Sequence, residues 1–163
     1  MASDQIRIRA ARIEDAAELS RMLNALGVHE GFGDGIYSPE SVRTHFFGPR
    51  PALEILVVED ASGLTGYAAY EGTFNTDCGQ HCIWLHDVYV VDDARGRGLG
   101  RRLMAEVARA VIAEGRTSVW WGVHSRNGHA RAFYAGLGAK DEDARILELD
   151  GEPLLALASA AGE

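Results

Sequence analysis

Apolar residues in the first third of the chain recur first with a period of two and then with a helical period. Two isoleucines alternate with arginines in Gln5–Arg9, which predicts a half-buried strand. The helical spacing over Ile13–Leu26 predicts a helix that we expect to end at Gly27. A serine directly before Pro39 is typical of a helix start, so a second helix is predicted over residues 38–47.

Three strand-like segments follow, separated by polar turns. Leu53–Val58 and Tyr67–Tyr70 flank the turn residues 60–63, an arrangement that predicts a hairpin. A second polar turn, Asn75–Gln80, leads into the long apolar run Cys82–Val91. We therefore expect three antiparallel strands before the next helix.

The last third of the chain alternates helical and strand patterns. A helix is predicted over Leu99–Glu114, a strand over Ser118–Val123, and a helix over Asn127–Leu137 with the asparagine as its cap. The order strand, helix, strand predicts a right-handed crossover between parallel neighbours. Arg145–Leu149 and Leu154–Leu157 are expected to form a closing strand pair. The fold class is therefore mixed α+β, in one domain over residues 1–163.

Composition narrows the classes of function. A chain of 163 residues with 47% hydrophobic residues can bury one substantial core. The formal net charge of -8 argues against nucleic acid as a partner and is compatible with cationic substrates. No signal peptide and no apolar run of membrane-spanning length is present, so a soluble cytoplasmic protein is expected, with no membrane partner.

Cysteine usage gives no disulfide framework and no clear metal site. Cys78 and Cys82 are close in sequence to Asp77 and His81, and a zinc site is the alternative to a loop with two incidental thiols. Tetrahedral sites usually recruit paired motifs from two places in the chain. We therefore expect no metal.

Between the long predicted strand and the following helix lies a turn of arginines and alternating glycines. It consists of Arg95-Gly96-Arg97-Gly98-Leu99-Gly100-Arg101, followed by Arg102. Glycine lets several backbone N–H groups point at one anion, the next helix directs its positive end there, and arginine donors suit phosphate oxygens. The spacing fits neither the Walker loop nor the dinucleotide fingerprint. The turn is predicted to bind phosphate, the alternative being a connection whose glycines serve tight packing.

Several short motifs follow one another from this strand onward. The strand ends Val88-Tyr89-Val90, and Arg95-x-x-Gly98-x-Gly100, Asn127 and Ala132-Phe133-Tyr134-x-x-x-Gly138 come after it. In this order they resemble the Gcn5-related N-acetyltransferases. The strand and the Asn127–Tyr134 segment look most like the diamine (spermidine/spermine) and thialysine acetyltransferase branch. That branch has a glutamate before Asp87, and this chain has His86 at that position.

The resemblance implies a mostly antiparallel central sheet with flanking helices and a parallel β-α-β crossover that binds acetyl-CoA as cosubstrate. In that family the turn holds the pyrophosphate and the strand edge pairs with the pantetheine arm. The implied cofactor-binding residues lie in the strand, the turn and the late helix: Val88, Tyr89, Val90, Arg95, Gly96, Arg97, Gly98, Leu99, Gly100, Arg101, Asn127 and Ala130.

Acetyl transfer to an amine needs a proton acceptor, because a primary amine with a pKa of ~10.4 is almost wholly protonated at pH 7. His86 is a candidate base, and the alternative is a strand histidine that packs and hydrogen-bonds. Asp87 is a candidate that acts through water or orients the ammonium, and the alternative is a local hydrogen bond to the neighbouring loop. Tyr134 is a candidate acid that protonates the departing thiolate, or else a core aromatic beside Phe133.

Three residues are candidates for the acceptor site. One of Trp120 and Trp121 is expected to line it, unless both simply pack, because neighbouring strand residues face opposite sides. Glu30 lies after the first helix, where the family builds its acceptor pocket, and suits a cation; its alternative is a solvated loop charge.

The resemblance, taken with these residues, implies an acetyl-CoA-dependent N-acetyltransferase that acts on a primary amine of a small cationic acceptor by direct attack in a ternary complex. Polyamines, thialysine and amino-acid-like amines are the candidate acceptors. The alternatives are a peptide or protein N-acetyltransferase and a non-catalytic acyl-CoA-binding sensor. The resemblance also implies a homodimer.

Overall fold

The structure is a computed structural model that describes residues 6–161. Gln5, predicted to begin the first strand, lies outside the described residues. The chain forms two compact units, residues 1–121 and 122–163. That the chain is one functional domain stays a prediction. No helix among residues 6–161 is long and apolar enough to cross a membrane.

The first unit is built on a five-stranded sheet. Its strands are β1 (Arg7–Ala10), β2 (Glu54–Asp60), β3 (Gly63–Asn75), β4 (Gln80–Val90) and β5 (Val119–Trp120), and they lie in this order. β1 to β4 pair antiparallel, and β4 pairs parallel with β5. The expected fold class, mixed α+β with a parallel crossover after an antiparallel sheet, is confirmed.

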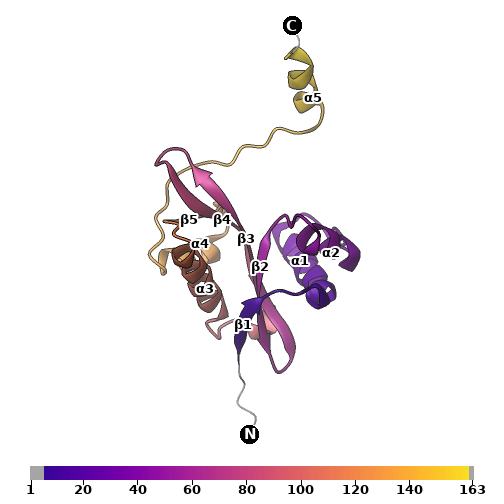
Figure 1. The fold of residues 1–163 in the computed structure, drawn as a ribbon, viewed down its shortest axis with the longest axis vertical. Coiled ribbons are helices and arrows are strands. Elements are labelled where there is room, and N and C mark those ends of the chain that lie inside the picture. The colour runs from indigo at the N-terminus through magenta and orange to yellow at the C-terminus, as the bar shows by residue number, and fades with distance from the viewer. Residues whose placement is uncertain (1–5, 162–163) are drawn as a thin grey trace. The chain divides into compact units, whose positions relative to one another are not determined.

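Helices cover both faces of this sheet (Figure 1). α1 (Ala16–Glu30), which follows the short 3-10 helix η1 (Ile13–Asp15), and α2 (Pro39–Phe47) lie on one face. α3 (Leu99–Ala113) lies on the other, after the 3-10 helix η2 (Asp92–Ala94). The capping prediction for α2 is confirmed, because the Ser41 N–H donates to Ser38 Oγ at 3.0 Å.

The core between the sheet and the first two helices follows the alternation of strand residues. Tyr67, Ala69 and Tyr89 from β3 and β4 belong to one buried cluster with α1 residues such as Leu19 and Leu23. Tyr67 has no exposed surface, and its ring lies 6.0 Å from that of Tyr89. One face of β3 and β4 is therefore fixed against α1, which matters for the site because the catalytic candidate Asp87 shares this face.

The second unit contains α4 (Gly128–Ala135) and α5 (Gly151–Ala160). Asn127 caps α4 as predicted, since its Oδ1 accepts the Ala130 N–H at 3.0 Å. The helix ends two residues before the predicted Leu137.

Two element predictions from the sequence are wrong. Gly27 does not end α1, which continues to Glu30 and ends at Gly31, where φ is 90°. A Cβ on Gly27 would lie 3.1 Å from the Gly33 carbonyl oxygen, and the Gly27 carbonyl accepts the Phe32 N–H at 2.8 Å. The glycine therefore admits a close approach of the following loop.

The predicted closing strand pair is also wrong. Arg145–Leu149 has no regular structure, and Leu154–Leu157 lies within α5. Pro153 falls in the first turn of α5, where a missing N–H costs nothing, and the leucines and alanines that follow are strong helix formers. A short apolar run does not by itself distinguish strand from helix, and here helix propensity prevails.

Candidate active site

The glycine-rich turn has the backbone of an anion-binding loop. Gly96 and Gly98 adopt φ of 77° and 74°, in the left-handed region that other residues rarely enter. A Cβ on either would meet no atom within 4 Å, so conformation and not crowding requires glycine there. Gly98 is the N-cap of α3, whose first bond runs from the Arg102 N–H to the Gly98 carbonyl at 3.1 Å.

The first-turn amides of α3 are those of Leu99, Gly100 and Arg101, which have no partner inside the helix by helix geometry. Together with the positive end of the helix they suit a diphosphate. The residues of this turn therefore fit the pyrophosphate of acetyl-CoA, and the binding roles inferred for them stay predictions.

The arginines of the turn also hold it against the sheet. Arg95 donates to the Val90 carbonyl at 3.1 Å, pairs with Asp92 at 2.8 Å, and lies 6.0 Å from the centre of the Tyr89 ring. Arg97 pairs with Asp60 at 2.9 Å. Arg102, which sequence reasoning placed among the phosphate donors, donates to the Ile6 carbonyl at 3.2 Å. These contacts fix the position of the turn, and the backbone amides remain the predicted anion donors.

A β-bulge interrupts β4 at His86. Ala69 on β3 pairs with Asp87, but the next residue, Tyr70, pairs with Leu85, so His86 has no opposite residue. Beyond this point β4 loses its other neighbour, because β5 pairs only with Ile83 and Trp84. Among residues 6–161, no strand pairs with the Leu85–Val90 edge on the β5 side. Such an edge presents backbone groups to an extended ligand, as the predicted role of Val88–Val90 requires.

Asp87 is held by a buried tyrosine on the neighbouring strand. The Tyr67 hydroxyl donates to Asp87 Oδ2 at 3.2 Å. Burial raises the pKa of Asp87, the hydrogen bond from Tyr67 opposes this, and the nearby charge of Glu30 raises the pKa further. Burial and the Asp87 charge also raise the pKa of Tyr67, so this hydroxyl stays a donor. The alternative weighed for Asp87, a local hydrogen bond to the neighbouring loop, is not the contact found, because its partner Tyr67 lies on β3.

His86 lies beside a second carboxylate. Its Nε2 is 3.0 Å from Glu71 Oε1, and both side chains are partly exposed. Glu71 follows Ala69 by two residues on β3 and therefore shares its face, which is also the face of Asp87. Sequence reasoning singled out neither Glu71 nor Tyr67, because only the strand register and the bulge bring them to His86 and Asp87.

The acceptor candidates are brought together only in part. Glu30, at the end of α1, lies within electrostatic range of Asp87. This proximity favours a role at the site over the alternative of a solvated loop charge. Trp120 is half-buried, donates from Nε1 to Ser118 Oγ at 3.0 Å, and pairs in register with Trp84. Trp121 is half-buried as well. The substrate-binding roles of these three residues stay predictions.

Tyr134 belongs to the second unit. It lies near the end of α4, is half-buried, and its ring is 5.1 Å from that of Phe133. Asn127 and Ala130 form the cap of the same helix. The catalytic role of Tyr134 and the cofactor contacts of Asn127 and Ala130 stay predictions.

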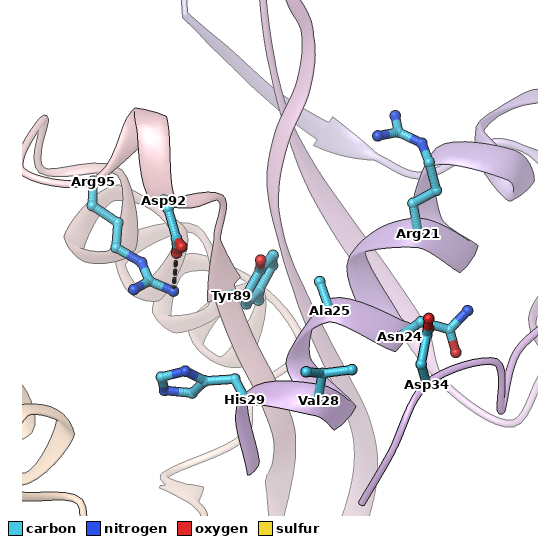
Figure 2. A pocket seen from close by; sticks show the side chains of 9 residues that line it. All are labelled: Arg21, Asn24, Ala25, Val28, His29, Asp34, Tyr89, Asp92 and Arg95. Carbon is cyan, nitrogen blue, oxygen red and sulfur yellow. Dashed lines mark ion pairs between the residues drawn. The ribbon is translucent and has the colours of Figure 1, made fainter. Parts of the chain in front are cut away.

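A cavity of about 500 Å³ lies beside the end of β4, between α1 and the turn (Figure 2). Tyr89 and Arg95 line it from the sheet side. Asp92 of η2 also borders it. The other side is lined by residues of α1 and of the loop after it: Arg21, Asn24, Ala25, Val28, His29 and Asp34. Sequence reasoning singled out Tyr89 and Arg95 but not Arg21 or Asn24, because polar side chains on α1 are typical of a solvated helix face.

An unpaired strand edge, a glycine-rich turn at a helix start and a carboxylate–histidine cluster are the features that an acyl-CoA-dependent transferase would require. The profile of the Acetyltransferase (GNAT) family matches residues 21–139, and the chain belongs to this family. It is an acetyltransferase, and acetyl-CoA is the cosubstrate of this family.

Relatives with assigned activities indicate which part of the family the chain resembles most. The chain is 30% identical to thialysine N-epsilon-acetyltransferase of Sus scrofa, over 94% of this chain and 97% of the relative. It is 28% identical to the L-amino acid N-acyltransferase MnaT of Escherichia coli, over 80% of this chain and 77% of the relative. These similarities place it in the thialysine and diamine acetyltransferase branch. An integron cassette protein from the mobile metagenome of V. cholerae has the same fold, with a TM-score of 0.79, 22% identity, and coverage of 94% and 97%.

Proposed function

We propose that this acetyltransferase transfers acetyl to a primary amine of a small cationic acceptor, by direct attack of the amine within a ternary complex. Acetyl-CoA supplies the acetyl group as a reactive thioester. The candidate acceptors are a polyamine, thialysine or another amino-acid-like amine, in line with the relatives that act on thialysine and on L-amino acids.

The observation that carries this proposal is the carboxylate cluster beside the bulge. Asp87, Glu71 and Glu30 lie around His86 or within electrostatic range of Asp87. Several carboxylates near one point attract and orient an ammonium group, and a nearby imidazole is a suitable acceptor for its proton. A site of this charge favours a cationic amine over a neutral or anionic acceptor.

The chain's own residues then divide the work. The turn amides hold the anionic part of the cosubstrate, and the β4 edge pairs with its extended arm. A group on β4, His86 or Asp87, takes the proton from the acceptor ammonium. The neutral nitrogen attacks the thioester carbon, the carbon–sulfur bond breaks, and the Tyr134 hydroxyl donates its proton to the departing thiolate and regains one from the attacking nitrogen. The Val88–Val90 amides are candidates to stabilise the oxyanion.

The first experiment is a measurement of thiol release from acetyl-CoA with polyamines, thialysine, amino acids, aminoglycosides and short peptides, and with CoA binding measured in parallel. Fast turnover on one small amine supports the proposal. Turnover on peptides alone would favour the peptide or protein acetyltransferase. Tight CoA binding without turnover on any acceptor would favour a sensor.

The role of Tyr134 is tested by Tyr134→Phe. Because general acid catalysis contributes about 10²–10⁴ in rate, we expect kcat to fall roughly a hundredfold while CoA binding is retained. Tyr70→Phe is the matched control, since Tyr70 is buried on β3 with a pKa raised by burial to about 12 and has no role in the proposed reaction. Equal kcat for Tyr134→Phe and the wild type would remove Tyr134 as the acid.

We also infer that the enzyme works as a homodimer in the cytoplasm, on a small-molecule acceptor, without nucleic acid or membrane partners, and without a metal. The resemblance to the diamine branch supports the dimer, and the acidic net charge of -8 supports the absence of nucleic acid. Sedimentation equilibrium of the purified protein tests the dimer.

A further inference from the structure

His86 occupies an unusual position in the sheet. It is the extra residue of the bulge in β4, and bulges re-aim a side chain that a regular strand would direct elsewhere. Its Nε2 contacts Glu71 Oε1 at 3.0 Å. Among residues 6–161, its Nδ1 has no hydrogen-bond partner. One nitrogen of the ring is therefore tied to a carboxylate, and the other is available to a ligand.

The chemistry of this contact fixes the tautomer of His86. An ionised carboxylate only accepts hydrogen bonds, so the nitrogen that faces Glu71 must carry a proton. A neutral imidazole has a single N–H, and Nδ1 then keeps its lone pair. Nδ1 in this state is a proton acceptor. When it takes a proton, the imidazolium keeps its hydrogen bond to Glu71, and the pair becomes an ion pair.

The surroundings of the pair add to this argument. Asp87 shares the face of Glu71 and is the next residue after His86, and Glu30 is within electrostatic range of Asp87. The Tyr67 hydroxyl occupies one oxygen of Asp87. The acceptor ammonium can thus be attracted by Asp87 and Glu30 while its proton is taken elsewhere, which separates binding from proton transfer.

A purely structural role does not account for the contact. The side chains of His86 and Glu71 are 37% and 47% exposed, and pairs so accessible to water contribute little to stability. The same contact is sufficient to select one of two tautomers, because the tautomers of a free imidazole differ little in free energy.

We propose that Glu71 is a positioning residue that holds His86 in the Nε2–H tautomer and presents Nδ1 to the acceptor amine. This rests on the proposed function and assigns the role of base to His86. One proton moves from the acceptor ammonium to Nδ1, and the imidazolium later releases it to water. Glu71 touches neither substrate.

The test combines a spectroscopic and a kinetic measurement on the full chain. In the first, ¹⁵N-histidine-labelled protein without substrates is studied by NMR, with the His86 signals assigned from His86→Gln. We expect the Nε2–H tautomer in the wild type and a mixture of both tautomers in Glu71→Ala. Glu54→Ala, which removes an exposed carboxylate from β2, is the control and should leave the tautomer unchanged.

The second measurement is a double-mutant cycle on kcat. Glu71→Ala should lower kcat about tenfold with the KM for acetyl-CoA unchanged, and it should have no further effect in a His86→Ala background. A loss that persists in that background, together with a raised KM for the amine, would overturn the proposal, because Glu71 would then contact the acceptor directly. An unchanged tautomer in Glu71→Ala would overturn it as well.

The two proposals fail in different ways. If no amine is acetylated, the proposed function fails, and the NMR measurement still decides whether Glu71 orients the ring. If amines are acetylated and His86→Ala retains full kcat, the proposed function stands, and the positioning role of Glu71 is excluded.

Discussion

At the scale of single residues, Asp87 is a carboxylate whose environment disfavours its charge. Burial raises its pKa, and the charge of Glu30 adds to this effect. The hydrogen bond from Tyr67 compensates only in part. A buried carboxylate with a raised pKa in a protein of this class is characteristic of a functional position, where charge is kept at a cost in stability.

The cost of Asp87 can be measured with Asp87→Asn. A raised pKa means that the folded state binds the proton more tightly than the unfolded state, so the contribution of this group to stability is complete below its usual pKa of 3.8 and is lost as pH rises through the folded-state pKa. At pH 7 the ionised carboxylate therefore destabilises the fold. Asp87→Asn removes the charge and keeps an oxygen for Tyr67. We expect a higher Tm than the wild type at pH 7 and a smaller difference near pH 4, by thermal denaturation followed by circular dichroism.

Asp60→Asn is the control with the opposite sign. Hydrogen bonds from Ser62 and Arg97 lower the pKa of Asp60, so its contribution to stability is present above 3.8 and is lost as pH falls. The Tm of Asp60→Asn should be lower than that of the wild type at pH 7. An Asp87→Asn variant with a lower Tm at pH 7 would show that the Asp87 charge is well compensated in the fold.

At the scale of elements, the turn between β4 and α3 depends on backbone conformation more than on its side chains. Gly98 has a φ of 74° and is the N-cap of α3, so the residues that follow it supply the first backbone amides of the helix. The arginines mainly attach the turn to the residue before β1, to the end of β2 and to η2. Loss of the left-handed conformation should therefore affect cosubstrate binding more than loss of one arginine.

We predict that Gly98→Ala weakens CoA binding about tenfold, equivalent to about 1.4 kcal/mol, and lowers the free energy of unfolding by about 1 kcal/mol. Gly79→Ala is a matched control, because Gly79 has a φ of 67° in the β3–β4 turn and an added Cβ also meets open space. Isothermal titration calorimetry with CoA and urea unfolding give the two quantities. Equal CoA affinity in both variants would mean that the turn does not hold the cosubstrate.

Elements with long, regular patterns were predictable from the sequence. The predicted helix Leu99–Glu114 corresponds to α3, because its apolar face repeats over several turns and Gly115 follows with a φ of 68°. The strand pair predicted for Arg145–Leu149 and Leu154–Leu157 was wrong, because segments of only four or five residues carry no clear period. Local propensity then decides the outcome.

The candidate site was predictable only where its residues are contiguous. The turn Arg95–Arg101 and its glycines are visible in the sequence, and Gly96 and Gly98 adopt left-handed conformations, whereas Gly100 lies in α3. The pairs Tyr67–Asp87 and Glu71–His86 join residues 20 and 15 positions apart. Their formation depends on the register of β3 with β4 and on the bulge, for which the sequence has no signal.

At the scale of the whole molecule, the net charge and the local charge of the turn have opposite signs, and each concerns a different substrate. The chain carries a net charge of -8, whereas the turn concentrates arginines and helix-end amides. A net negative protein attracts a cationic amine over a long range. We expect an anionic cosubstrate to be repelled by the molecule as a whole and attracted only near the turn, its predicted binding site.

Ionic strength should therefore affect the two substrates in opposite directions. The screening length falls from about 30 Å at 0.01 M salt to about 8 Å at 0.15 M, so the long-range field of the net charge is largely removed over this range. We expect kcat/KM for a doubly charged amine to fall by about tenfold, and kcat/KM for acetyl-CoA to stay constant or rise. Steady-state thiol release in a KCl series measures both, with sucrose of equal osmolarity as the control. A fall for acetyl-CoA with no change for the amine would contradict the assignment of a cationic acceptor, because the acidic surface would then have no part in capturing it.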